Sequence, residues 1–228
     1  GPFMELYCSA PAAKAMHHVY LGGLLEHSLA LVKLVHSIVP LYEGINEDLL
    51  VVGALLHDVG KIQEMSFERA FDYTDEGKLI GHITIGVELV SDRMRLIDGF
   101  PRELAMLLKH MLLSHHGQYE YGSPKRPKTI EATILNYLDD MDSKINGIRA
   151  HIARENVSTS RWTAHHRLYD RYFFKCNGMD GEQEVERLCD ETCEPPQAEK
   201  PVEATSARQE RQNFGNQPFK ALENLDLF

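Results

Sequence analysis

The sequence contains few cysteines, a single tryptophan and no long uninterrupted apolar run. Its 228 residues include four cysteines, at positions 8, 176, 189 and 193, and their spacing is uneven. So sparse a set does not build a disulfide framework and favours a reduced, cytoplasmic compartment. The last three cysteines could also ligate zinc, but no paired set of ligands accompanies them in their polar surroundings.

No apolar run approaches the ~20 residues that span a membrane, so we expect no membrane partner. The first residues, Gly-Pro-Phe-Met, lack the charged start and apolar centre of a signal peptide. They either remain from cloning or mark the chain as a piece of a longer protein. The hydrophobic content of 43% can support a core, and the length predicts one domain with additional segments.

The net charge of −10 argues against a uniformly basic nucleic-acid-binding protein, but the charge is unevenly distributed. Residues 176–228 carry 12 Asp or Glu and 5 Lys or Arg, in a stretch rich in Gln, Pro and Asn. This composition predicts disorder. The remainder is nearly neutral, which permits a local basic groove. We therefore expect a domain over 5–175 and an acidic, mostly disordered tail over 176–228 that ends in a short apolar peptide.

Helical periodicity dominates residues 5–175, so the predicted fold class is all-α. Asn46 is a candidate helix N-cap and Pro101 a candidate helix start. We expect a lead-in turn and helix start at the beginning, and a loop after Lys61 with a short extended pair (69–74 with 78–80). The spacing of apolar residues predicts helices over 17–39, 49–56, 82–97, 101–114, 129–155 and about 159–175.

The chemistry concentrates in residues 54–61, ALLHDVGK, where an apolar helical run ends in an adjacent His and Asp. An imidazole and a carboxylate suit a divalent metal, and Asp58 can bridge two ions with its two oxygens. Gly60 would let the helix stop. Lys61 would then stand beside the metals, where it can hold a phosphate. A His-Asp pair alone is weak evidence, and the motifs around it strengthen the interpretation.

Taken with those motifs, the chain resembles the HD superfamily of metal-dependent phosphohydrolases, and within it the YhaM-type 3′→5′ exoribonucleases. The resemblance covers about residues 5–175 and implies an HD-domain helical bundle. It also implies hydrolysis of phosphoesters by a water that bound metals activate. The segments that carry it are APAAKAMHHVYLGGLLEHS (10–28), ALLHDVGKI (54–62), GHI (81–83), LLSHHG (112–117) and ILNYLDDMDSKI (134–145).

The resemblance implies two metal ions that share Asp58. We expect Mn²⁺, with Fe²⁺, Ni²⁺ or Co²⁺ as alternatives for this mixed nitrogen and oxygen donor set. Some HD phosphodiesterases add a glutamate one turn before the first histidine, but Gly23 stands there, which argues against a third ion. The implied ligands are His27, His57, Asp58 and Asp139 for one ion, and His82, His115 and His116 with Asp58 for the other.

Several of these residues have a structural alternative. A lone histidine on an apolar helix is usually part of a core, His82 could cap a helix, and a helix dipole favours histidines at its C-terminal end. His110 is expected to be structural. Asp139 and Asp142 share a helix face, from which Asp140 points away. Asp142 is therefore expected to orient a ligand or a bound water, or to take a proton during catalysis, alongside catalytic Asp58 and Lys61.

The finer resemblance predicts 3′→5′ exonuclease action on single-stranded RNA, with DNA as a further substrate. Besides Lys61, the candidate substrate-binding residues are His17, His18, Arg161 and Arg171, with further bases at 125–128 and aromatic residues for stacking. YhaM-type enzymes usually carry a strand-binding domain before the HD region, and none is present here. The alternative function is therefore hydrolysis of a nucleotide or a short oligonucleotide.

The last five residues, Asn-Leu-Asp-Leu-Phe, are similar to the peptide that binds the bacterial sliding clamp, with Asn for the usual Gln. Leu225, Leu227 and Phe228 would enter a groove of that partner, and the polar tail would supply reach. The alternative is a C-terminal helix that packs on the domain. A catalytically silent interaction module is a third possibility, which the complete ligand set disfavours. The oligomeric state stays open.

Overall fold

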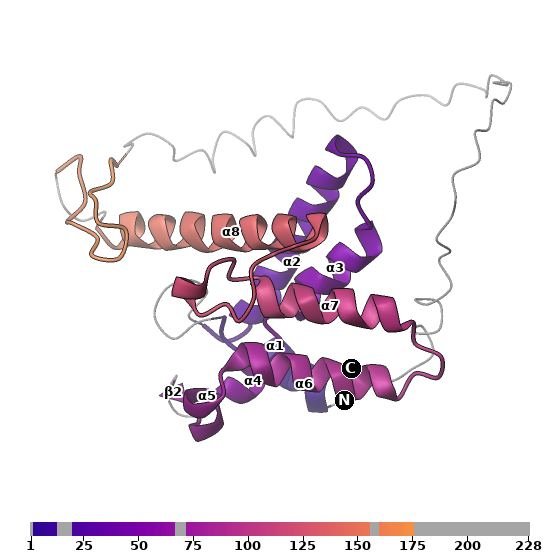
Figure 1. Ribbon diagram of the computed structural model, residues 1–228. Coiled ribbons are helices and arrows are strands. Elements are labelled where there is room, and N and C mark those ends of the chain that lie inside the picture. The colour runs from indigo at the N-terminus through magenta and orange to yellow at the C-terminus, as the bar shows by residue number, and fades with distance from the viewer. Residues whose placement is uncertain (1, 13–19, 67–71, 156–159, 176–228) are drawn as a thin grey trace, which may run out of the picture. The chain divides into compact units, whose positions relative to one another are not determined.

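The computed structural model describes residues 2–12, 20–66, 72–155 and 160–175. They divide into two compact units, one up to Ala150 and one from His151 onward. The first unit is built from helices with one short strand pair, which confirms the predicted all-α class (Figure 1). The longer helices are α1 (Pro2–Ser9), α2 (Gly23–Ile38), α3 (Glu47–Leu56), α6 (His82–Arg95), α7 (Arg102–Ser114) and α8 (Ile130–Arg154). The shorter elements are η1 (Val39–Leu41), α4 (Lys61–Glu64), β1 (Met65–Ser66), β2 (Asp72–Tyr73), α5 (Asp75–Leu79) and η2 (Tyr119–Tyr121).

Local sequence signals determine several helix ends. The side chain of Asn46 accepts a hydrogen bond from the Leu49 backbone N at 3.0 Å and caps α3, as predicted. Pro101 directly precedes α7. α2 begins later than predicted because Gly22 adopts a φ of +86°, where a Cβ would lie 3.3 Å from the Cys8 carbonyl oxygen. The helix α1 was not predicted.

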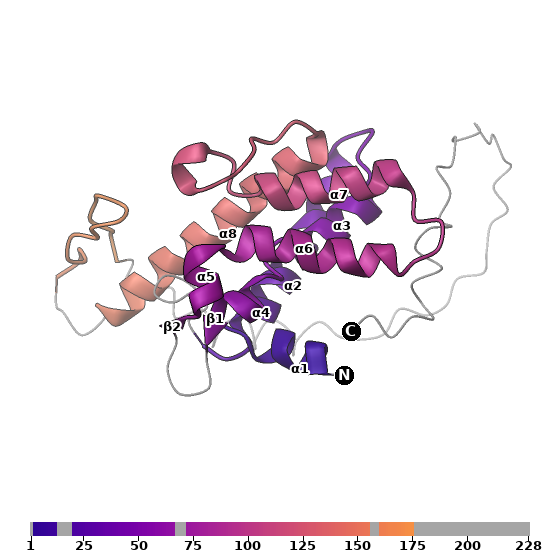
Figure 2. The ribbon, with the colours of Figure 1, turned by 60° about the horizontal axis from the view of Figure 1, so that its bottom comes forward.

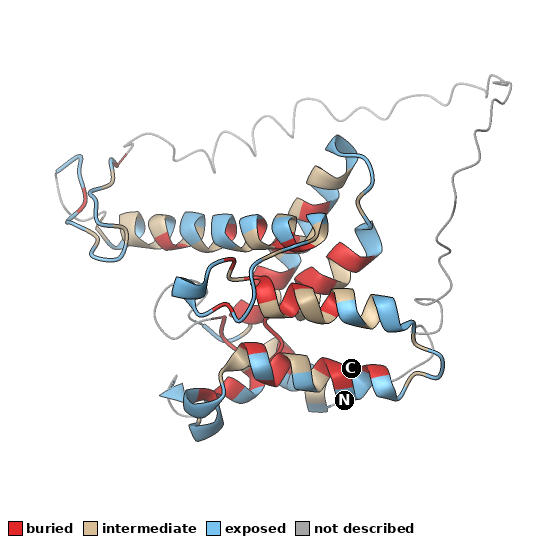
Figure 3. Cartoon of the chain, viewed as in Figure 1, coloured by how far each residue is buried: buried red, intermediate tan, exposed pale blue. Residues whose placement is uncertain are grey.

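The core of the first unit consists of apolar side chains from α2, α3, α7 and α8, with α1 and α6 packed against them. The buried residues lie on the helix sides that face one another, and exposed residues cover the outer sides (Figure 3). α6 and α7 run side by side in opposite directions (Figure 2). Burial of each large apolar side chain contributes about 1.5–3 kcal/mol. Fully buried examples are Leu24, Leu31, Leu50, Met111, Leu112 and Leu135.

The sequence suggested that Gly60 stops a helix, and this prediction is wrong. α3 already ends at Leu56, and Gly60 has an ordinary helical φ of −63°. A Cβ at Gly60 would lie 2.0 Å from the carbonyl oxygen of His82. Only glycine therefore allows the first turn of α6 to approach the turn that carries His57 and Asp58.

The segment after α4 differs from the predicted extended pair. β1 pairs with β2 in antiparallel register, with Met65 opposite Tyr73. Residues 75–79 form α5 because the Thr74 side chain caps it by accepting a hydrogen bond from Gly77 N at 2.9 Å.

The prediction of a helix over 159–175 is wrong. The described part of the second unit is a hairpin-like loop in which Trp162 bridges to Phe174 and His166 to Arg171. Its turn contains Asp170 at a φ of +49°. The aromatic residues that suggested a helix face instead pair across this turn.

The segment Gly23–Leu41 is long and apolar enough to cross a membrane by length and composition alone. It has 19 residues, a hydropathy of 1.4 and 28% of its window buried. The segment is apolar only on average, because Glu26, Lys33 and two histidines interrupt it. Core helices pass the same test, and this segment contains α2, which buries Leu24, His27 and Leu31.

The predicted domain end at 175 and the disordered tail over 176–228 concern residues outside the described ranges. Both stay predictions, as does the alternative zinc site, because three of its cysteines lie in that tail.

Candidate metal centre

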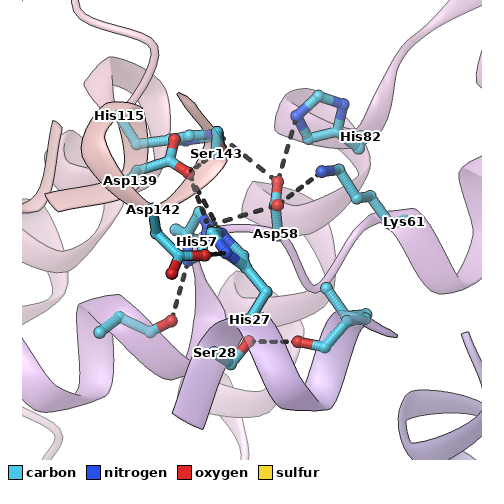
Figure 4. Close-up of polar contacts among 12 residues, drawn as sticks. His27, Ser28, His57, Asp58, Lys61, His82, His115, Asp139, Asp142 and Ser143 are labelled. Carbon is cyan, nitrogen blue, oxygen red and sulfur yellow. Dashed lines mark hydrogen bonds and ion pairs between the residues drawn. The ribbon is translucent and has the colours of Figure 1, made fainter. Parts of the chain in front are cut away.

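The implied metal ligands gather in one buried or partly buried region of the first unit, and Figure 4 shows all of them except His116. α2 supplies His27 from its first half, and α8 supplies Asp139. The others stand at helix ends, where a short turn can aim them inward: His57 and Asp58 after α3, His82 at the start of α6, and His115 and His116 after α7.

The candidate ligands fall into two groups. Within each group, one potential ligand atom per residue lies within 4.8 Å of the others. We call them the first group, which is His27, His57 and Asp139, and the second group, which is His82, His115 and His116.

Asp58 lies between the two groups. Its Oδ2 is 3.3 Å from His57 Nε2 in the first group. Its Oδ1 is 3.4 Å from His82 Nε2 and 3.6 Å from His115 Nε2 in the second group. Each carboxylate oxygen therefore faces a different group, which is the arrangement that a bridging ligand requires.

All five histidines present Nε2 to the centre because a partner holds each Nδ1. When Nδ1–H is donated outward, Nε2 keeps its lone pair for a metal. The distances are 2.7 Å for His27 to Asp142 Oδ2, 3.0 Å for His82 to Glu64 Oε1, and 2.8 Å each for His57 to Ala54 O, His115 to Leu112 O and His116 to Tyr121 O.

Three buried polar atoms have no hydrogen-bond partner among the described residues: Asp58 Oδ1, His82 Nε2 and His115 Nε2. An unsatisfied buried polar group costs about 1–3 kcal/mol. One divalent cation could accept electron pairs from all three atoms. The residues present therefore fit a metal ion at the second group.

Electrostatics favours the ligand protonation states at neutral pH. Burial would raise the pKa of Asp58, but the charges of Lys61 and His57 hold it well below its usual range. Burial lowers the pKa of His115 and also that of His116. Ionised carboxylates and neutral imidazoles are the forms that bind metals.

His27 differs from the other histidines in the metal-free protein. Burial would lower its pKa, but hydrogen bonds to Asp139 and Asp142 outweigh this and raise it to about 9. The resulting imidazolium stabilises the two carboxylates while no metal is bound. A metal at the first group has to displace this proton.

Lys61 and Asp142 are both part of the centre. Lys61 Nζ donates to Asp58 Oδ2 at 2.6 Å, so the proposed phosphate-binding ammonium pairs with the proposed bridging carboxylate. Asp142 contacts His27, as expected for an orienting residue, and its Oδ1 accepts from Asn146 Nδ2 at 3.0 Å. Asp140, in contrast, lies at the surface with Lys144.

Sequence reasoning missed Glu64. This buried residue accepts hydrogen bonds from both the backbone N and Nδ1 of His82, each at 3.0 Å. Burial would raise the pKa of Glu64, but these contacts lower it. The sequence offers no signal for this role because no motif or spacing rule connects Glu64 with His82, which lies 18 residues later. His110, in contrast, belongs to neither ligand group, and its Nε2 accepts from Lys128 N at 2.9 Å.

The remaining candidates lie outside the described residues or in the second unit. His17, His18, Leu225, Leu227 and Phe228 lie outside the described residues. Arg161 and Arg171 are exposed residues of the second unit. Arg161 stacks at 4.5 Å over the Phe174 ring, and Arg171 Nε donates to the Tyr169 carbonyl at 2.8 Å.

Comparison with protein families matches residues 24–144, more than half of the chain, to the HD domain. Three similar curated proteins are each named 3′-5′ exoribonuclease YhaM. The relative from Geobacillus sp. (strain WCH70) is 42% identical over 174 residues, 76% of this chain and 53% of that protein. The one from Bacillus subtilis (strain 168) is 39% identical over 72% of this chain and 52% of its own.

The relative from Listeria monocytogenes serotype 4b (strain F2365) is 48% identical over 63% of this chain and 46% of its own. The chain thus spans about half the length of the curated relatives that it matches. No solved structure matches it.

Proposed function

Because the chain belongs to the HD domain family, whose members bind divalent metals, we propose that it is a metal-dependent phosphodiesterase that removes nucleotides from the 3′ end of single-stranded RNA. The observation that carries this proposal is Asp58, whose two oxygens face two separate groups of imidazole Nε2 atoms. The similar proteins are named 3′-5′ exoribonucleases, which supports attack from the 3′ end and the choice of RNA. Single-stranded DNA is a further substrate to test.

We propose two metal ions, most readily Mn²⁺, at the first and second groups with Asp58 between them. Bound there, they would supply Lewis acidity that activates water and offsets charge on the phosphoryl oxygens. Lys61 would hold a non-bridging phosphate oxygen, since its ammonium lies 2.6 Å from Asp58. Asp142 would fix the orientation of His27 through Nδ1. It would also take a proton during catalysis.

Further binding residues and the compartment belong to the same proposal. His17, His18, Arg161 and Arg171 would contact the strand, supported by their charge and by the sequence resemblance. We propose a cytoplasmic location, which the few, unevenly spaced cysteines support because disulfide-rich proteins belong to oxidising compartments.

One assay tests the function. Metal-free protein is incubated with an end-labelled single-stranded RNA, and separately with the matching DNA, after addition of Mn²⁺. A ladder that shortens from the 3′ end, absent with Asp58→Ala, is the expected result. Release of phosphate from nucleotides without strand shortening would replace this function with nucleotide hydrolysis.

We also propose, on the terminal Asn-Leu-Asp-Leu-Phe alone, that the tail binds a bacterial sliding clamp. A pull-down with clamp protein should then be lost on Leu227→Ala together with Phe228→Ala. Retention by this double variant would discard the interaction.

A further inference from the structure

A basic hollow lies on the outer side of α7. It has a volume of about 570 Å³, and its lining includes Arg102, Lys109, His110, Lys125 and Lys128. Two sequence regions contribute to it, α7 and the loop at 122–128. This concentration of positive charge contrasts with the net charge of −10 of the whole chain.

The loop is fixed against α7 by backbone hydrogen bonds. Lys125 N donates to the Leu113 carbonyl at 3.1 Å, and Lys128 N donates to His110 Nε2 at 2.9 Å. Pro124 and Pro127 restrict the same loop. The lysines therefore stand on a constrained backbone, which lowers the entropy lost when they bind an anion.

The four cations of the hollow make no ion pair with any residue that the structure describes. Elsewhere the lysines at 61 and 144 and the arginine at 95 each pair with a carboxylate three or four residues away. Like charges that share a hollow without acids repel one another, and an anionic partner removes that repulsion. A polyanion with regularly spaced charges fits several cations along a groove.

The segments that line the hollow are joined to the second group through the chain and through hydrogen bonds. Lys109 lies on α7, which ends at Ser114, directly before His115 and His116 of the second group. Leu113, whose carbonyl accepts from Lys125 N, precedes His115 by two residues. His116 Nδ1 donates to the Tyr121 carbonyl, which ties the start of the following loop to the centre.

We infer that this basic hollow binds the sugar-phosphate backbone of the single strand whose 3′ end lies at the metal centre. The inference rests on the proposed function and adds a path for the strand. It gives Arg102, Lys109, Lys125 and Lys128 a shared role as phosphate contacts. Such contacts carry no base information, so the hollow binds without sequence preference.

The test compares two triple variants of the full chain. The groove variant combines Lys109→Ala, Lys125→Ala and Lys128→Ala. The control variant combines Lys33→Ala, Lys78→Ala and Lys144→Ala, three exposed lysines on other elements. Both remove the same charge, so a general electrostatic effect would appear in both. Thermal melting confirms that each variant folds.

Binding of a labelled 12-nucleotide RNA is measured in chelator between 50 and 200 mM salt. Each lost phosphate contact on a single strand reduces the slope of log K against log salt by about 0.7. We expect the groove variant to lose about 2 from the slope and the control to keep it. With Mn²⁺, the ratio of kcat/KM for the 12-mer to that for a dinucleotide should fall at least about tenfold in the groove variant.

A slope and a ratio equal to those of the control variant would overturn the inference while leaving the exonuclease function intact. A wild-type chain that cleaves dinucleotides but neither binds nor shortens the 12-mer would overturn both. These two outcomes are distinguished by the wild-type measurements alone.

Discussion

Replacement of Glu64 by Ala should weaken metal binding at the second group while leaving the first group occupied. Glu64 Oε1 lies 3.0 Å from both the backbone N and Nδ1 of His82. It therefore fixes the ring and directs the lone pair of Nε2 toward Asp58. Without this acceptor the ring can rotate or change tautomer, and the second group loses one of its three imidazoles.

The magnitude follows from the hydrogen bond. A bond to a charged group contributes about 1.5–3 kcal/mol, and 1.4 kcal/mol corresponds to a factor of ten in affinity. We therefore expect the affinity of the second group to fall about 10- to 100-fold, the range for partners that hold metal ligands. Glu64→Gln keeps an acceptor oxygen and loses the charge, so its loss should be smaller, about tenfold or less.

The assay measures Mn²⁺ bound per chain against free Mn²⁺ at equilibrium. Wild type should show two binding steps, and Glu64→Ala should shift only one of them to higher concentration. Glu76→Ala is the control. Glu76 is an exposed acid on α5, and its replacement removes the same negative charge as Glu64→Ala. Melting of each protein in chelator shows whether the fold persists.

Two unshifted steps in a folded Glu64→Ala protein would refute the reasoning. A shift of both steps by the same factor would also refute it, because Glu64 would then act on the whole centre rather than on His82.

Other changes probe the first group and the helix contact. Asp142→Asn should reduce metal affinity at the first group about tenfold, and a pH–rate profile equal to that of wild type would remove Asp142 from proton transfer. Gly60→Ala should lower the melting temperature, because its Cβ would lie 2.0 Å from the His82 carbonyl and overpacking costs about 1–3 kcal/mol or more. In chelator, His27 with its pKa raised to about 9 contributes stability that is fully present below its usual value of 6.5 and is lost as pH rises through 9. Urea unfolding should therefore show lower stability at pH 10 than at pH 6, and His27→Gln should reduce that difference. Mn²⁺ at 100 times its Kd should stabilise the wild type by about 2.7 kcal/mol, and an unchanged melting temperature would contradict specific binding.

Some features were determined by sequence because they depend on neighbours along the chain. Asn46 caps α3 through a residue three positions away, and the helical spacing of apolar residues gave α6, α7 and α8 to within two residues. The same local reasoning placed Asp139 and Asp142 on one face of α8. It failed over 159–175, where aromatic side chains pair across a turn and no helix forms.

Other features were decided only by tertiary structure, because they join residues that no spacing rule connects. Asp58 faces both ligand groups only because α2, α6, α7 and α8 converge on the turn after α3. The roles of Glu64 and Gly60 arise where α4 meets the first turn of α6, a contact between segments 18 or more residues apart. The residue types that suit a metal could be recognised in sequence, whereas the direction of each imidazole depends on the partner that holds its Nδ1, and packing alone supplies that partner.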